Sequence, residues 1–176
     1  MQDSPRLEIV CLSDSDDMLR EAEAVAEGVR RAGVARTWRI AEDSGFTVGM
    51  WHALDAADCI VLCGFACADG LTLQAKTFAD ASHTRMFGRV WEDKLAGAFT
   101  DYGCPAGEET EVMQYLWTLI HQHGMVWAAQ GQIATARLDA DPRYADLTAA
   151  QNYGRKLAEL ASIFAAERRE SEQLAA

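Results

Sequence analysis

The sequence predicts one α/β domain over residues 1–176, built on a doubly wound sheet of five parallel strands with helices on both faces. Two observations lead to this prediction. Apolar runs of strand length alternate with segments of helical periodicity about five times along the chain. The run at residues 59–63, CIVLC, is apolar throughout, as expected for a strand in the middle of a parallel sheet. Strands linked through helices connect by right-handed crossovers, which places them parallel in one sheet.

The first strand, the first helix and the second strand follow from the spacing of apolar residues. Residues 6–12, RLEIVCL, form a mostly apolar run of strand length. The next apolar residues recur on one helical face, and Gly33 follows them as a helix stop. This face consists of Met18, Ala22, Val25, Ala26 and Val29. Residues 34–40, VARTWRI, roughly alternate between apolar and polar side chains, which favours a second strand.

The middle of the chain predicts two helices and two strands. In order, the expected elements are a loop at residues 43–45, a short helix at 48–57, the strand at 59–63, a third helix, and a strand at 95–100, LAGAFT. The third helix is predicted because Leu71, Ala75 and Phe78 lie at helical spacing.

The final third predicts two helices around one short strand. The first of these helices follows a loop at residues 102–107, and acidic residues near its start favour its positive end. Its apolar face consists of Val112, Leu116, Leu119, Ile120 and His123, and the acidic residues are Glu108, Glu109 and Glu111. Residues 125–129, MVWAA, form the last strand, and residues 148–151, TAAQ, have the form of a capping box before the closing helix. The charged tail after Glu167 is expected to fray.

Composition excludes several classes of function. The chain has 16 basic and 27 acidic residues and a formal net charge of -11, which argues against nucleic acid and anionic membranes as partners. No apolar run approaches the ~20 residues that span a bilayer, and the N-terminus lacks the pattern of a signal peptide. Five cysteines without framework spacing suit reduced thiols, so we expect a cytoplasmic protein.

Three loops leave the carboxyl ends of predicted strands, which is where parallel sheets of this kind gather ligands. We name residues 12–17, LSDSDD, the first loop; residues 64–70, GFACADG, the second loop; and residues 101–108, DYGCPAGE, the third loop. A functional site is therefore expected where these loops meet.

Residues 94–131 resemble the flavodoxin-like NAD(P)H:quinone oxidoreductases, which are relatives of the tryptophan-repressor-binding protein. The matching features are a strand, a loop that ends Gly107-Glu108-Glu109-Thr110, and a helix that leads to His123-Gly124-Met125-Val126. Similar segments at residues 57–62 and 153–158 extend the resemblance over nearly the whole chain. It implies a flavodoxin-like fold, an FMN cofactor, NAD(P)H as electron donor, a quinone as electron acceptor, and a homodimer or homotetramer.

The same resemblance implies a set of site residues. They are Ser13 and Ser15 for the FMN phosphate, Gly103 and Gly107 in the third loop, and His123 as the catalytic residue beside the ring. Phe65 and Tyr102 are further candidates for cofactor binding by stacking on the flavin ring; alternatively, they are loop aromatics packed on the rim of the sheet. His123 would orient flavin or substrate, or relay a proton; alternatively, it caps the last turn of its helix.

The first loop departs from the family pattern Ser-x-Thr-Gly-Asn-Thr, because Asp14, Asp16 and Asp17 surround its serines. A helix N-terminus favours an anion, and these carboxylates can cap the helix in place of phosphate. Each carboxylate ~4 Å from a phosphate charge costs ~1 kcal/mol in water and ~4 kcal/mol near a partly buried surface. We therefore expect FMN binding to be weak or absent.

Two alternatives remain open. The chain could be a non-catalytic binding or scaffold module that keeps the fold without the cofactor. The cysteines at strand ends and in loops could also form a thiol or soft-metal site, although buried cysteine is more often a small core residue. The cysteines concerned are Cys11, Cys63, Cys67 and Cys104.

Overall fold

The computed structural model describes residues 4–41, 45–64, 66–67, 70–100, 108–128 and 147–175. Within this part of the chain, no helix is both long and apolar enough to span a membrane.

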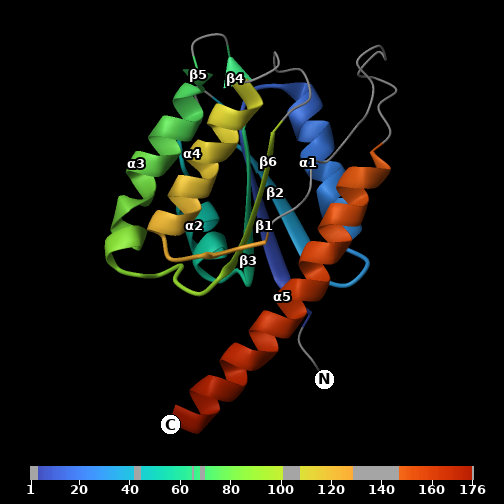
Figure 1. The fold of residues 1–176 in the computed structure, drawn as a ribbon, viewed down its shortest axis with the longest axis vertical. Coiled ribbons are helices and arrows are strands. Elements are labelled where there is room, and N and C mark those ends of the chain that lie inside the picture. The colour runs from blue at the N-terminus through green and yellow to red at the C-terminus, as the bar shows by residue number, and fades with distance from the viewer. Residues whose placement is uncertain are drawn as a thin grey trace.

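A five-stranded sheet with the order β2-β1-β3-β6-β7 forms the centre of the molecule (Figure 1). Its strands are β1 (Arg6–Leu12), β2 (Val34–Arg39), β3 (Cys59–Gly64), β6 (Leu95–Thr100) and β7 (Val126–Trp127). Every neighbouring pair is parallel, and β3 is the middle strand. The predicted α/β fold class is therefore confirmed, including the central position of the CIVLC run.

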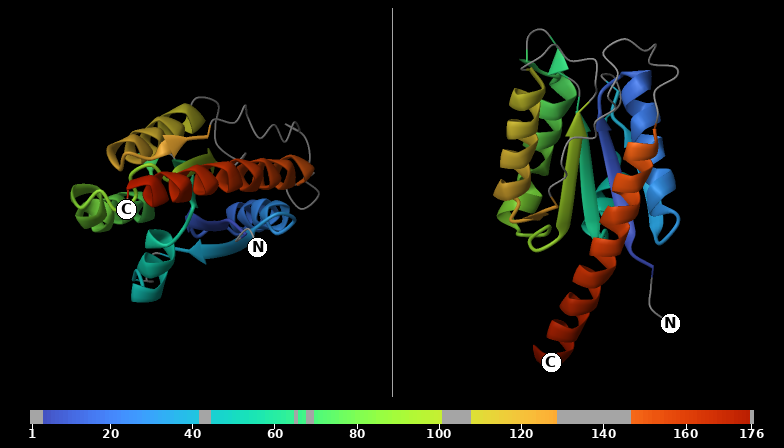
Figure 2. Two further views of the ribbon diagram at one scale, coloured as in Figure 1. Left: turned by 90° about the horizontal axis from the view of Figure 1, so that it is seen from below. Right: turned by 45° about the vertical axis from the view of Figure 1, so that its right-hand side comes forward.

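Helices cover both faces of this sheet (Figure 2). α1 (Asp16–Val29) and α5 (Thr148–Ala175) pack on one face; α2 (Val48–Asp55), α3 (Leu73–Phe87) and α4 (Glu108–Gln122) pack on the other. A short antiparallel pair, β4 (Ala66–Cys67) and β5 (Gly70–Leu71), lies between β3 and α3 in the chain.

The two-residue period of β1 divides the core into two clusters. Leu7, Ile9 and Cys11 face α1 and α5, whereas Val10 and Leu12 face the other three helices. All five side chains are fully buried, as expected for a strand covered on both faces.

Two element boundaries differ from the predictions. Leu71 belongs to β5 and not to the third helix, because Thr72 caps that helix by accepting a hydrogen bond from the Ala75 amide. The last strand covers only Val126–Trp127. α5 continues to Ala175 and extends past the sheet (Figure 1), since the tail is rich in Ala, Glu, Arg and Gln, which favour helix. The fraying expected after Glu167 stays a prediction.

α1 and α5 cross at two glycines. A Cβ added to Gly154 would overlap the backbone oxygen of Val25, and one added to Gly28 would overlap the backbone oxygen of Gln151. The side-chain amide of Gln151 also donates to Glu27 at 2.9 Å. This close backbone approach fixes how α5 lies on the helix that follows the first loop.

We expect Gly154→Ala to lower the free energy of unfolding by ~1–3 kcal/mol, because the new methyl group forces the two helices apart. Urea denaturation followed by circular dichroism measures this change.

Gly49→Ala is the matched control. Gly49 is exposed on α2, and an added Cβ would meet only the Thr47 hydroxyl at 4.0 Å. This variant should be as stable as the parent or more stable by up to ~1 kcal/mol, because alanine favours helix. Equal stability of the two variants would contradict the close helix contact.

Candidate functional site

The candidate site lies at the carboxyl edge of the sheet, at the top of Figure 1, where the three loops leave β1, β3 and β6. The chain moves from β1 outward to β2 and then returns to β3 on the other side of β1, so the order reverses between β1 and β3. Ligands of doubly wound sheets bind at such a switch point. The first loop lies at this position.

Several predicted site residues lie outside the described part of the chain. They are Phe65, Tyr102, Gly103 and Gly107, together with Cys104 and the side chain of Cys67. The expectations for these residues, including stacking on a flavin ring, therefore stay predictions.

The serines of the first loop hydrogen-bond to the loop's own backbone. The Ser15 amide donates to the Ser13 hydroxyl at 3.0 Å, and the Met18 amide donates to the Ser15 hydroxyl at 3.2 Å. Ser15 is thus the N-cap of α1, and Ser13 is buried. The two hydroxyls predicted to contact phosphate already accept hydrogen bonds from amides at the start of the helix.

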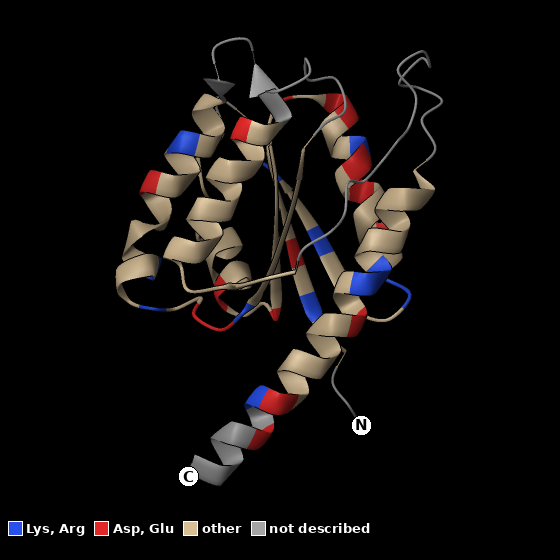
Figure 3. Ribbon diagram, in the orientation of Figure 1, with Lys and Arg blue, Asp and Glu red and all other residues tan. Residues whose placement is uncertain are grey.

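The predicted capping by aspartates is corrected by this geometry. Ser15 immediately precedes the helix and holds the cap, whereas Asp16 and Asp17 lie in the first helical turn. Asp16 pairs with Arg39 at 2.9 Å, and Asp17 pairs with Arg20 at 3.1 Å. Figure 3 shows acidic residues at this end of α1. These negative side chains interact favourably with the positive end of the helix dipole, but they do not serve as the N-cap.

The first loop is also held by residues from other elements, which sequence reasoning missed. Arg39, at the end of β2, donates to the Asp14 carbonyl oxygen at 2.5 Å. Thr72 donates to the Leu12 carbonyl oxygen at 2.9 Å, and Gln74 donates to the Asp14 carboxylate at 2.9 Å. Only the Thr72 N-cap has a local sequence signal.

This arrangement does not fit the phosphate of FMN as the fold family holds it. A phosphate accepts hydrogen bonds and favours positive potential, but the Ser15 and Met18 amides of the described loop already donate to serine hydroxyls, and the loop carries carboxylates. Two nearby cations are already paired with loop carboxylates: Arg39 with Asp16 and Arg20 with Asp17. Phosphate would have to displace bonds that the chain makes with itself.

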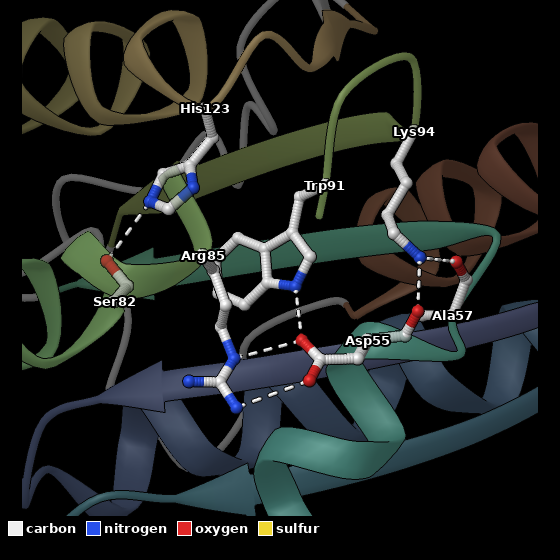
Figure 4. A network of polar contacts seen from close by, with 7 residues as sticks. All are labelled: Asp55, Ala57, Ser82, Arg85, Trp91, Lys94 and His123. Carbon is white, nitrogen blue, oxygen red and sulfur yellow. Dashed lines mark hydrogen bonds and ion pairs between the residues drawn. The ribbon is translucent and has the colours of Figure 1, made fainter. Parts of the chain in front are cut away.

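His123 lies at the opposite edge of the sheet. It follows α4, which begins after the carboxyl end of β6 and returns to the amino end of β7. Its side chain is buried, its Nε2 lies 3.0 Å from the Ser82 hydroxyl, and its ring is 4.5 Å from that of Trp91 (Figure 4). The structure therefore does not bring His123 together with Ser13 and Ser15, and the imidazole contacts Ser82, not the end of its own helix.

A polar network surrounds His123 and ties the amino edge together (Figure 4). Asp55 accepts two hydrogen bonds from Arg85, at 2.9 and 3.2 Å, and one from the Trp91 indole at 2.8 Å. Lys94 donates to the carbonyl oxygens of Asp55 and Ala57, and burial lowers the pKa of Lys94 to about 8. These contacts join α2, α3 and the segment before β6, so we assign the network a structural role.

The Ser82–His123 pair is also structural. Ser82 is completely buried, and its hydroxyl donates to the Ala79 carbonyl oxygen at 2.8 Å. A buried serine engaged in this way offers no nucleophile to a substrate. The Nδ1 of His123 has no hydrogen-bond partner among the described residues.

The predicted four-cysteine site is described only in part. Cys11 and Cys63 are free and fully buried on adjacent strands. Within the described residues, no group of three or more His, Cys, Asp or Glu side chains is arranged to hold a metal ion.

His123 should make stability depend on pH. Burial, with the charges of His83 and Arg85, lowers the pKa of His123 from 6.5 to about 4. The unfolded chain therefore binds this proton at a higher pH than the folded chain, and stability falls as the pH drops from about 6.5 towards 4. We expect this group to contribute on the order of 2–3 kcal/mol to that loss.

His123→Gln should flatten this part of the pH profile of unfolding free energy, measured by urea denaturation at a series of pH values. His52→Gln is the control, because His52 is exposed on α2. An unchanged profile in His123→Gln would contradict the assignment.

Comparison with known proteins places this geometry in a family. No family model matches the chain. The chain is 30% identical over 135 residues to flavodoxin FldP of Pseudomonas aeruginosa, covering 77% of this chain and 71% of that protein. It is 34% identical to a flavodoxin, WrbA-like protein from Agrobacterium tumefaciens of known crystal structure, with a TM-score of 0.75 and coverage of 90% and 98% of the two chains. A flavone reductase structure shares the fold, with a TM-score of 0.64 and 14% sequence identity. The match covers 89% of this chain and 62% of the flavone reductase chain. The chain therefore belongs to the flavodoxin family.

Proposed function

We propose that this protein is a flavin-related oxidoreductase of the NAD(P)H:quinone type in which FMN binding is weak or absent. Membership of the flavodoxin family and the similarity to a WrbA-like flavodoxin support the flavin-related part. A cytoplasmic location, a quinone as electron acceptor and assembly as a homodimer or homotetramer are part of the same proposal. In such proteins the bound flavin supplies the redox chemistry and the protein supplies binding and electrostatics.

One observation carries the proposal of weak binding: the first loop closes on itself. The Met18 amide donates to the Ser15 hydroxyl, and the Ser15 amide donates to the Ser13 hydroxyl. Flavodoxin-like proteins normally use this turn at a helix N-terminus for the phosphate. A phosphate here would compete with two hydrogen bonds worth ~0.5–1.5 kcal/mol each.

Charge adds to this competition. The first loop contains Asp14, Asp16 and Asp17. Each of these carboxylates repels a phosphate ~4 Å away by ~1 kcal/mol when exposed and by more when partly buried. Asp16 is 85% exposed and paired with Arg39, so its repulsion is screened. The summed effect is on the order of 2–4 kcal/mol, or about 30- to 1,000-fold in affinity.

A non-catalytic module is the second candidate, and the same self-closed loop favours it. The two candidates differ in one property. An oxidoreductase would gain activity when flavin binding is restored, whereas a scaffold would bind flavin without transferring electrons from NAD(P)H to a quinone.

Replacing Asp14 by Thr, Asp16 by Gly and Asp17 by Asn should tighten FMN binding by about 30-fold or more, because the repulsion is removed. Quenching of flavin fluorescence during titration measures the dissociation constant. The parent protein should be colourless after purification and bind FMN weakly.

A charge-matched control replaces Glu159, Glu167 and Glu170 of α5 by Gln, which removes the same charge far from the loop. This control should leave FMN affinity unchanged. Tight FMN binding by the parent protein would refute the proposed weak binding. No gain in the Asp14, Asp16 and Asp17 variant would show that the carboxylates do not exclude FMN. NAD(P)H-dependent quinone reduction by the FMN-loaded variant then decides between the two candidates.

A further inference from the structure

Two cysteines lie opposite each other directly below the first loop. Cys11 of β1 is the register partner of Cys63 of β3, and each is the next-to-last residue of its strand. Neighbouring strands lie ~4.8 Å apart, which is inside the ~4.4–6.8 Å range of Cα separations in disulfides. Both side chains belong to the cluster that faces α1 and α5, so they point to the same side of the sheet.

Each of the two thiols donates to a backbone carbonyl oxygen. The Cys11 sulfur is 3.8 Å from the Ser13 carbonyl oxygen, and the Cys63 sulfur is 3.5 Å from the Val10 carbonyl oxygen. Both cysteines are free in the structure, and both are completely buried.

We propose that Cys11 and Cys63 form a dithiol oxidation site, which a small peroxide converts to a disulfide. The thiolate of one cysteine attacks a peroxide oxygen, the O–O bond breaks, water leaves after protonation, and a sulfenic acid remains on sulfur. The second thiol then attacks this sulfur, the S–O bond breaks, and a second water leaves. Two thiols and hydrogen peroxide thus give one disulfide and two waters, with two electrons passing from the sulfurs to the peroxide.

The order of attack follows from the surroundings of the thiols. The neighbouring Cys63 thiol lowers the pKa of Cys11, whereas burial raises the pKa of Cys63. Cys11 is therefore the attacking cysteine and Cys63 the resolving one, since the thiolate is the nucleophile. Oxidation removes the thiol that contacts the Ser13 carbonyl oxygen, which links the redox state of the pair to the first loop. This inference does not depend on the proposed function.

Peptide mapping of the full-length protein tests the proposal. The protein is treated with hydrogen peroxide, denatured, alkylated with N-ethylmaleimide, digested without reductant and analysed by mass spectrometry. The expected product is a Cys11–Cys63 linked peptide that appears on oxidation and disappears after treatment with dithiothreitol. Alkylation of both cysteines after oxidation, sulfinic acid at either one, or linkage of either to another cysteine would overturn the proposal.

Two variants sharpen the test. Cys59→Ala is the matched control, because Cys59 is equally buried on β3 but has Leu7 and Leu95 as register partners. It should form the Cys11–Cys63 link as the parent does. Replacement of both Cys67 and Cys104 by Ala should also leave the link intact, since the pair needs no third cysteine; loss of the link in that variant would count against the proposal.

Discussion

The hydrogen bond from the Met18 amide to the Ser15 hydroxyl is the interaction on which the candidate site depends. The first turn of any helix has amides without partners, and an anion or a capping side chain must satisfy them. Here the chain itself supplies a partner for two amides: Ser15 for the Met18 amide, and Ser13 for the Ser15 amide. The weak phosphate binding that we propose for this turn rests on these two local hydrogen bonds.

The rest of the fold keeps this closed loop in place. Arg39 from β2 and Gln74 from α3 hold Asp14 from two different elements, and Thr72 holds Leu12. α1, which begins at the loop, is fixed against α5 through close backbone contact. The network of Asp55, Arg85 and Trp91 stabilises the opposite edge of the sheet.

Sequence patterns predicted the strands and most helices because burial has a local period. The strand at residues 6–12 was predicted with its observed bounds, and the apolar run that begins at Cys59 lies in the middle of the sheet. The site was less predictable, since its contacts join distant positions: Arg39 and Gln74 are 25 and 60 residues from Asp14. His123 was assigned to the flavin ring from the family resemblance, whereas the structure places it at the amino edge, to which a helix between two parallel strands returns. The N-cap could be predicted from the local sequence, because Ser15 lies three residues before Met18, which is the spacing between a capping side chain and the amide that it binds.

The weak FMN binding that we propose requires that the amides of Ser15 and Met18 are occupied by the chain itself. Amide chemical shifts, recorded by nuclear magnetic resonance during addition of FMN, report on these two groups directly. Both signals should stay in place until FMN is in large excess. Movement of both signals in proportion to FMN, complete at one equivalent, would show that phosphate displaces the serine hydroxyls and would contradict the proposed weak binding.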